Sequence, residues 1–68
     1  MAQRQGYLTT KQTDGWAVRR DGAQRTVSLH STKEEAWNET KRRARAIGGE
    51  AILQGANGKI QTKNRYGQ

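Results

Sequence analysis

The sequence predicts a small α+β domain of order β-β-β-α-β-β, a small antiparallel sheet with one amphipathic helix packed on one face. Three observations predict this class. Residues 31–49 carry a helix start signal, an apolar stripe and a paired-glycine stop; two alternating runs precede them around Asp-Gly, and two more follow around Asn-Gly. The 68 residues are expected to form one domain, 1–68, with an ordered core at about 6–63 and fraying ends.

Three strands are expected before the helix. Residues 6–11 (GYLTTK) are rich in strand-forming types, and a turn at residues 13–15 follows them. Residues 16–20 (WAVRR) and 25–30 (RTVSLH) alternate apolar and polar side chains on either side of an Asp-Gly turn. The loop between these two strands can have two or four residues, and either length places the same side chains on the inward face. That face is expected to hold Trp16, Val18, Val27 and Leu29.

The helix signals lie within residues 31–49. Ser31 is the expected N-cap with Glu34 at N3, a capping box, and Thr32 offers the same pattern one residue later. Gly48 follows the last apolar position and suits a left-handed C-cap. With about 100° per residue, one arc is expected to face the core, with Trp37 as its anchor. This arc contains Ala36, Trp37, Thr40, Ala44 and Ile47.

A second hairpin is expected after the helix. Residues 50–54 (EAILQ) and 59–63 (KIQTK) flank a Gly-Ala-Asn-Gly loop at 55–58. A four-residue loop would set Leu53 opposite Ile60. The tail at 64–68 contains one aromatic residue, which either folds back on the core or frays.

Composition indicates a polyanionic partner. The formal net charge is +7, from 13 Lys and Arg against 6 Asp and Glu, and the pI is near 10.6. Leu, Ile, Val and Phe together number only eight, a fraction typical of disordered chains. Two tryptophans and the clear pattern of apolar positions argue for a folded domain instead. The chain has no cysteine and no run of about 20 apolar residues, so a soluble, cytoplasmic protein without a membrane partner is expected.

Catalytic constellations are missing from the sequence. His30 is the one histidine and is expected to be a hydrogen-bonded residue at a strand end, without a second base for Ser28 or Ser31. We therefore expect no enzyme activity, no metal site and no cofactor. Residues 55–58 match the GxxG of KH domains, but that loop joins helices, whereas these flanks alternate as strands and indicate a turn.

Several turn glycines and core positions resemble a known family. They are Gly15-Trp16-Ala17-Val18-Arg19, Thr32, Glu35-Ala36, Ala44, Gly48-Gly49-Glu50, Gly55, Gly58, Ile60 and Tyr66-Gly67. Together they resemble the small bacterial and phage family called domain of unknown function 2188, over nearly the whole chain. The resemblance implies the fold and carries no catalytic residues. The basic run at 41–45 is heavier than in the helices of that family, which mix acids with bases.

The functional hypothesis is nucleic-acid binding through phosphate contacts, with duplex DNA favoured. The alternative is a protein-interaction module or a phage or mobile-element accessory factor that binds an acidic protein surface, as a monomer or weak homodimer. Docking on anionic membranes is weaker, because the apolar helix face is thin. The candidate nucleic-acid contacts are Arg19, Arg20, Arg25, Lys41, Arg42, Arg43, Arg45, Lys59, Lys63 and Arg65.

Overall fold

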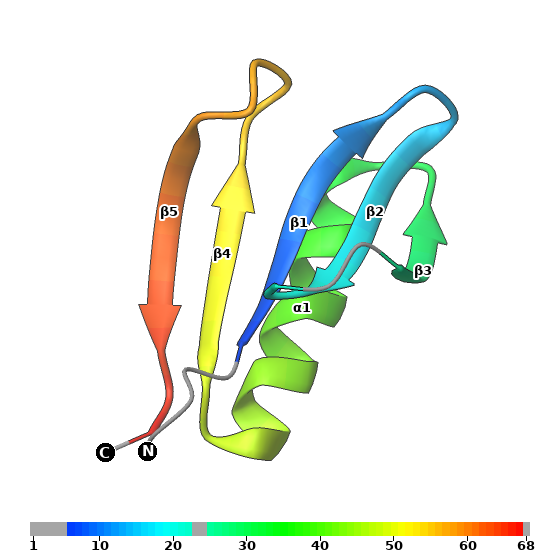
Figure 1. The fold of residues 1–68 in the computed structure, drawn as a ribbon. Coiled ribbons are helices and arrows are strands. Elements are labelled where there is room, and N and C mark those ends of the chain that lie inside the picture. The colour runs from blue at the N-terminus through cyan, green and yellow to red at the C-terminus, as the bar shows by residue number, and fades with distance from the viewer. Residues whose placement is uncertain (1–5, 23–24, 68) are drawn as a thin grey trace.

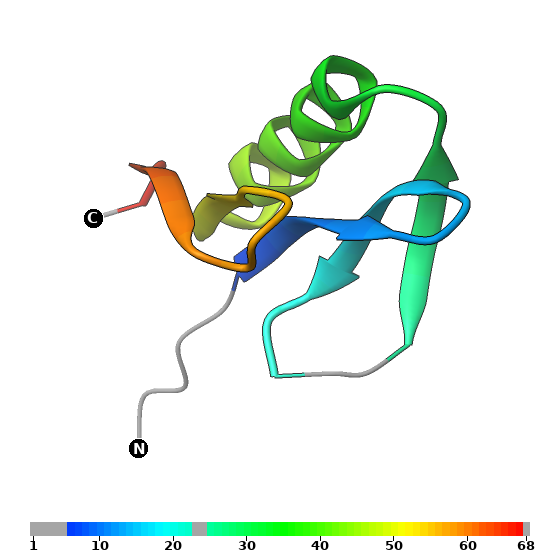
Figure 2. The same cartoon turned by 90° about the horizontal axis from the view of Figure 1, so that it is seen from above.

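The computed structural model describes residues 6–22 and 25–67, and it confirms the predicted α+β class and order of elements (Figure 1). One helix covers one face of a five-stranded sheet, as Figure 2 shows from above. The elements are β1 (Gly6–Gln12), β2 (Gly15–Arg20), β3 (Thr26–His30), α1 (Lys33–Ile47), β4 (Glu50–Gln54) and β5 (Ile60–Arg65).

The sheet is mixed, with strand order β3-β2-β1-β4-β5. Three of the pairings are antiparallel, but β1 and β4 run parallel, so the expectation of an antiparallel sheet is wrong for this pair. The cause is the crossover through α1, which begins where β3 ends and returns the chain to the end of the sheet where β1 begins (Figure 1). Parallel neighbours require such a crossover.

A β-bulge changes the register of the β2–β3 hairpin. Val18 pairs with Ser28, and the register shifts between Val18 and Arg19. Leu29 therefore lies opposite Ala17 on the face away from α1, where it is 50% exposed. The prediction that Val27 and Leu29 point inward is wrong, because a shift of one residue reverses the faces of a strand.

The second hairpin has a bulge of the same kind. Ile60 pairs with Gln54 and Thr62 with Leu53, so the expected pairing of Leu53 with Ile60 is wrong. Ile60 is 57% exposed as a result. The loop at 55–58 is a turn between two strands, with the Gly58 N–H donating to the Gly55 carbonyl at 2.9 Å. The interpretation of these glycines as a turn is confirmed.

The helix packs on the sheet through small side chains. Ala36, Thr40 and Ala44 are fully buried, and the Thr40 hydroxyl lies 2.6 Å from the Thr9 hydroxyl of β1. This close approach leaves no room for an indole beneath the helix, so Trp37 is half-buried instead of anchoring the core. Ile47 is 41% exposed at the end of the helix, contrary to its expected inward position.

Both ends of α1 are capped. Thr32 is the N-cap and accepts a hydrogen bond from the Glu35 N–H at 3.2 Å, so the helix begins one residue later than a Ser31 cap would give. Gly48 adopts a left-handed conformation with φ of 67°. The Gly49 N–H donates to the Ala44 carbonyl at 2.9 Å, as in a Schellman motif.

The C-terminal tail folds back on the end of the helix. The Tyr66 N–H donates to the Gly49 carbonyl at 2.9 Å. Gly67 lies so close to Gly48 that a Cβ atom would clash with the Gly48 carbonyl oxygen. Of the predicted tail, residues 64 and 65 extend β5 and residues 66 and 67 fold back on the helix end. The expected fraying at residues 1–5 and 68 lies outside the described residues.

Candidate functional site

Charge is distributed unevenly along the molecule. The β1–β2 turn, the start of α1 and the β4–β5 loop meet at one end of the sheet (Figure 1). This neutral end carries three cations and three carboxylates, namely Lys11, Asp14, Lys33, Glu34, Glu35 and Lys59. The rest of the described chain, which we call the basic part, carries nine Lys and Arg residues against three carboxylates.

The basic part contains nine of the ten predicted contact residues. Lys59 is the exception, because it follows the β4–β5 loop at the neutral end. The nine comprise four on the second half of α1, three on the β2–β3 hairpin and two on β5. They are Lys41, Arg42, Arg43, Arg45, Arg19, Arg20, Arg25, Lys63 and Arg65.

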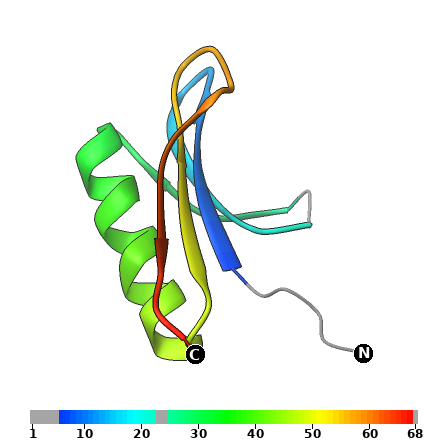
Figure 3. The same ribbon diagram turned by 90° about the vertical axis from the view of Figure 1, so that its left-hand side faces the viewer.

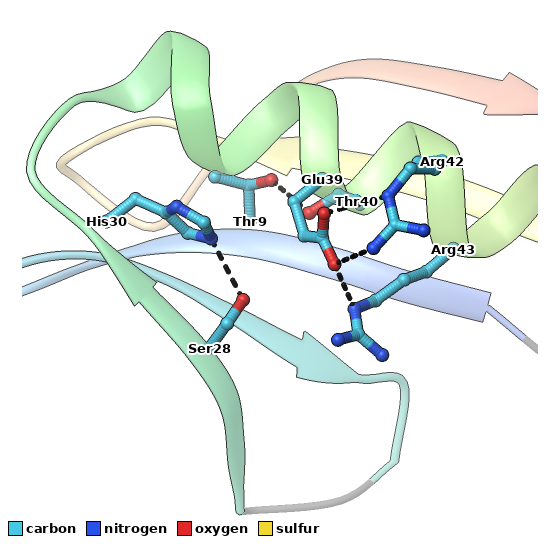
Figure 4. A network of polar contacts seen from close by, with 7 residues as sticks. All are labelled: Thr9, Ser28, His30, Glu39, Thr40, Arg42 and Arg43. Carbon is cyan, nitrogen blue, oxygen red and sulfur yellow. Dashed lines mark hydrogen bonds and ion pairs between the residues drawn. The ribbon is translucent and has the colours of Figure 1, made fainter.

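One side of α1, the carboxylate flank, is organised around Glu39 (Figure 4). Its carboxylate accepts hydrogen bonds from Arg42 Nε at 3.0 Å, Arg42 Nη2 at 2.7 Å and Arg43 Nε at 2.6 Å. The hydrogen bond from Arg42, with that from Arg43, lowers the pKa of Glu39, although burial opposes this shift. The same contact raises the pKa of Arg42. Glu39 thus stays ionised and offsets one of the two arginine charges.

The opposite side of α1, the aromatic flank, places cations on rings. Lys41 Nζ lies 5.4 Å from the centre of the Trp37 ring, and Arg45 Cζ lies 5.5 Å from that of Tyr66. Residues four apart share one side of a helix. Within the described residues, neither cation has a carboxylate within ion-pair distance. Both cations therefore keep their full charge.

A third aromatic ring joins α1 to the β2–β3 hairpin. Arg43 Cζ lies 6.0 Å from the centre of the Tyr7 ring, and Tyr7 pairs with Arg20 in the β1–β2 ladder. Arg43 therefore contacts the ring, and Arg20 lies on the neighbouring strand opposite Tyr7. Arg42 and Arg43 share the Glu39 carboxylate on the same side of α1.

The remaining predicted cations have different surroundings. Arg65 donates from Nε to Glu50 Oε2 at 3.1 Å, and Glu50 is only 5% exposed. Lys63 and Arg25 are exposed, and no described carboxylate pairs with either. Arg19 is half-buried in β2. The structure therefore gathers the predicted cations into one part of the molecule but separates those on α1 from those on β5.

Sequence reasoning missed a cation pair around Trp16 at the neutral end. Lys11 Nζ lies 5.3 Å and Lys33 Nζ 5.7 Å from the centre of the Trp16 ring. Lys11 pairs with Trp16 across the two-residue turn at 13–14, so the hairpin register was a usable signal. Lys33 reaches the ring only because α1 packs on the sheet, and the sequence carries no signal for that contact.

His30 is the last residue of β3 and is hydrogen-bonded to Ser28, which confirms the prediction of a hydrogen-bonded residue at a strand end. Ser28 Oγ lies 2.9 Å from His30 Nε2, because residues two apart share a face of β3 (Figure 4). No carboxylate in residues 6–22 or 25–67 hydrogen-bonds to His30. The described part of the chain encloses no pocket and holds no group of three acidic or histidine side chains arranged for a metal. Among the described residues, α1 is too short and polar to span a bilayer.

Comparison with known proteins gives a family without an established activity. Residues 7–66 match the family model described as "Uncharacterized protein conserved in bacteria (DUF2188)". The chain is similar to the uncharacterized protein YdaT of Bacillus subtilis (strain 168), with 39% identity over 57 residues. The match covers 84% of this chain and 38% of YdaT, and no solved structure matches. The chain therefore belongs to the DUF2188 family of uncharacterised bacterial proteins.

Proposed function

We propose that this protein binds nucleic acid, with duplex DNA favoured, through phosphate contacts made by its basic part, and that its role is binding and not catalysis. One observation carries the proposal: nine of the twelve described Lys and Arg side chains lie with only three carboxylates in one part of the molecule. A surface of this kind attracts a polyanion and orients it during approach.

The aromatic flank supports the proposal most directly. Lys41 and Arg45 are one helical turn apart, a rise of about 6 Å, so they can reach neighbouring phosphates along one strand. Their contacts with Trp37 and Tyr66 restrict the side chains without cancelling the charge, unlike contacts with carboxylates. Less side-chain freedom is then lost when a phosphate binds.

The carboxylate flank extends this surface. Arg42 and Arg43 use some of their N–H donors on Glu39 and keep others for a ligand. Glu39 holds both guanidinium groups in place but cancels one charge, so this flank contributes less attraction per arginine. Arg20, which pairs with Tyr7 in the β1–β2 ladder, extends the surface towards the β2–β3 hairpin.

Fluorescence anisotropy of labelled duplex DNA at four salt concentrations tests the proposal. If about five phosphates are neutralised, the logarithm of the binding constant falls with log salt at a slope of about −4.5. Single-stranded DNA and structured RNA of equal length establish which nucleic acid is preferred. A slope near zero, or no binding at low salt, contradicts the proposal.

A further inference from the structure

The sheet face away from α1 holds more large aliphatic side chains than the covered face. The ladder places Leu8 beside Ile52, and Leu29 and Ile60 fall on the same face through their pairing with Ala17 and Gln54. The covered face of the sheet holds Val18 and Leu53. This distribution is the reverse of that expected for a two-layer domain whose second face meets water.

Two of these side chains are strongly exposed. Leu29 is 50% and Ile60 57% exposed, and half of the eight large aliphatic residues in the chain are exposed to a similar degree. Single exposed aliphatic residues are ordinary, but here two bulges turn both side chains to one face. The end of the β2–β3 hairpin bends towards this face, away from α1 (Figure 3).

The charges on this face indicate what covers it. Lys63 is exposed on β5, and the Arg65 side chain is 68% exposed. Glu50 is the one carboxylate among the described residues of this face, and it is buried and paired with Arg65. An apolar face with a basic border complements a partner with leucine-like side chains and carboxylates.

We propose that the uncovered sheet face docks an acidic amphipathic helix of another protein. A helix satisfies its own backbone hydrogen bonds, and the other face is already covered in this way. A second copy of this chain fits less well. Each copy carries +7, and five strands of about five residues offer about 400 Å², half of the about 800 Å² per partner of a standard interface.

Nucleic acid also fits this face less well than a protein helix. Tyr7 and Trp16 point to the covered side, Trp37 lies on α1, and Tyr66 lies against Arg45 of α1. No described aromatic ring is therefore present on the uncovered face for bases to stack on. Lys63 and Arg65 also belong to the basic part, but the two flanks of α1 that support nucleic-acid binding lie on the other side of the sheet. The two proposals can therefore fail separately.

A peptide titration tests the inference. The probe is a helical peptide of about 18 residues with leucines on one face and glutamates on the other, and a matched peptide has lysines instead of glutamates. Nitrogen-15 chemical shifts of the full chain are followed during each titration. We expect the glutamate peptide to perturb the amides of Thr10, Ile52 and Lys63, and the lysine peptide to bind at least about tenfold more weakly.

Two variants locate the contact. Leu29→Thr/Ile60→Thr is expected to weaken binding of the glutamate peptide at least about fivefold, because both anchors are removed. Ile47→Thr changes an aliphatic residue of similar exposure on α1 and is expected to leave binding unchanged. Thermal unfolding followed by circular dichroism verifies that both variants fold.

Several outcomes would overturn the inference. Equal binding of the two peptides, shift changes confined to α1, or unchanged affinity in the double variant would each do so. Absence of binding at millimolar peptide would do the same. Sedimentation that reveals a dimer, lost in Leu29→Thr/Ile60→Thr, would assign the face to a second copy instead.

Discussion

The two flanks of α1 position cations by different means. On the carboxylate flank, Arg42 and Arg43 are held by Glu39 through charged hydrogen bonds of 2.6 to 3.0 Å. On the aromatic flank, Lys41 and Arg45 lie on the rings of Trp37 and Tyr66. The first arrangement fixes geometry and cancels charge, whereas the second restricts the side chains and leaves the charge available.

This difference explains how a small domain can remain strongly basic. Six acidic residues cannot neutralise 13 basic ones, and three of the six lie at the neutral end. The described aromatic rings each lie near at least one cation. Rings therefore replace acids as partners for much of the excess charge.

The largest effect on stability is expected at the buried contact between the hydroxyls of Thr9 and Thr40, which lies between the two flanks of α1. Thr40→Val leaves the Thr9 hydroxyl buried without its partner and is expected to cost about 1–3 kcal/mol of the free energy of unfolding. Urea denaturation measures this cost. Thr9→Val/Thr40→Val removes both hydroxyls and is expected to be less destabilised than the sum of the single variants. Additive costs would show that the two hydroxyls do not interact.

Neutralising Glu39 tests whether this carboxylate mainly cancels the charge of Arg42 and Arg43 or mainly positions them. Glu39→Gln releases Arg42 and Arg43 from a charged partner and is expected to strengthen DNA binding about fivefold at low salt. The free energy of unfolding is expected to fall by only about 0.5 kcal/mol, because the flank lies at the surface. Anisotropy and urea denaturation measure the two effects. Weaker DNA binding in this variant would mean that Glu39 positions the arginines more than it neutralises them.

The pH dependence of the same residue gives a smaller effect. The pKa of Glu39 is lowered in the folded protein from its ordinary value of 4.5, so its ionised form stabilises the fold. This stabilisation is complete above the unfolded pKa and is lost as pH falls through the folded pKa. The difference in unfolding free energy between wild type and Glu39→Gln is therefore expected to shrink as the pH falls from about 6 and to be lost below the folded pKa. A difference that grows on acidification would contradict the assignment.

The smallest effect is expected from the ring contacts of the aromatic flank. Lys41→Gln and Arg45→Gln each remove a cation from a ring at the surface, at a cost of about 0.5 kcal/mol. Urea denaturation monitored by tryptophan fluorescence measures both costs. Lys63→Gln, a cation without a ring contact, is the matched control and is expected to change stability less. Equal costs in the three variants would show that the rings do not hold the cations.

Much of the fold follows from local signals in the sequence. The ends of the helix are specified by Thr32, which caps the first turn, and by Gly48, which adopts a left-handed conformation. The hairpin turns are specified by glycines that adopt positive φ angles, such as Gly22 and Gly58. The bulges before Arg19 and Gln54 carried no such signal, so the faces of Leu29 and Ile60 were predicted wrongly. Register depends on contacts between strands, which alternation alone does not determine.

The candidate site was predictable to a similar extent. The composition predicted the excess of cations. The basic run at 41–45 predicted a cluster of cations on the second half of the helix. Which of these cations pair with Glu39, and which lie on rings, depends on the two sides of α1 and on the tail that brings Tyr66 under Arg45. These are tertiary contacts that no single segment encodes.

The most direct measurement compares two double variants with the same change of formal charge. Lys41→Gln/Arg45→Gln removes the cations of the aromatic flank, and Lys11→Gln/Lys33→Gln removes two cations from the neutral end. Anisotropy of duplex DNA at four salt concentrations is expected to show about tenfold weaker binding and a slope less steep by about 2 for the first variant, with little change for the second. Equal losses in the two variants, or a larger loss at the neutral end, would contradict the account.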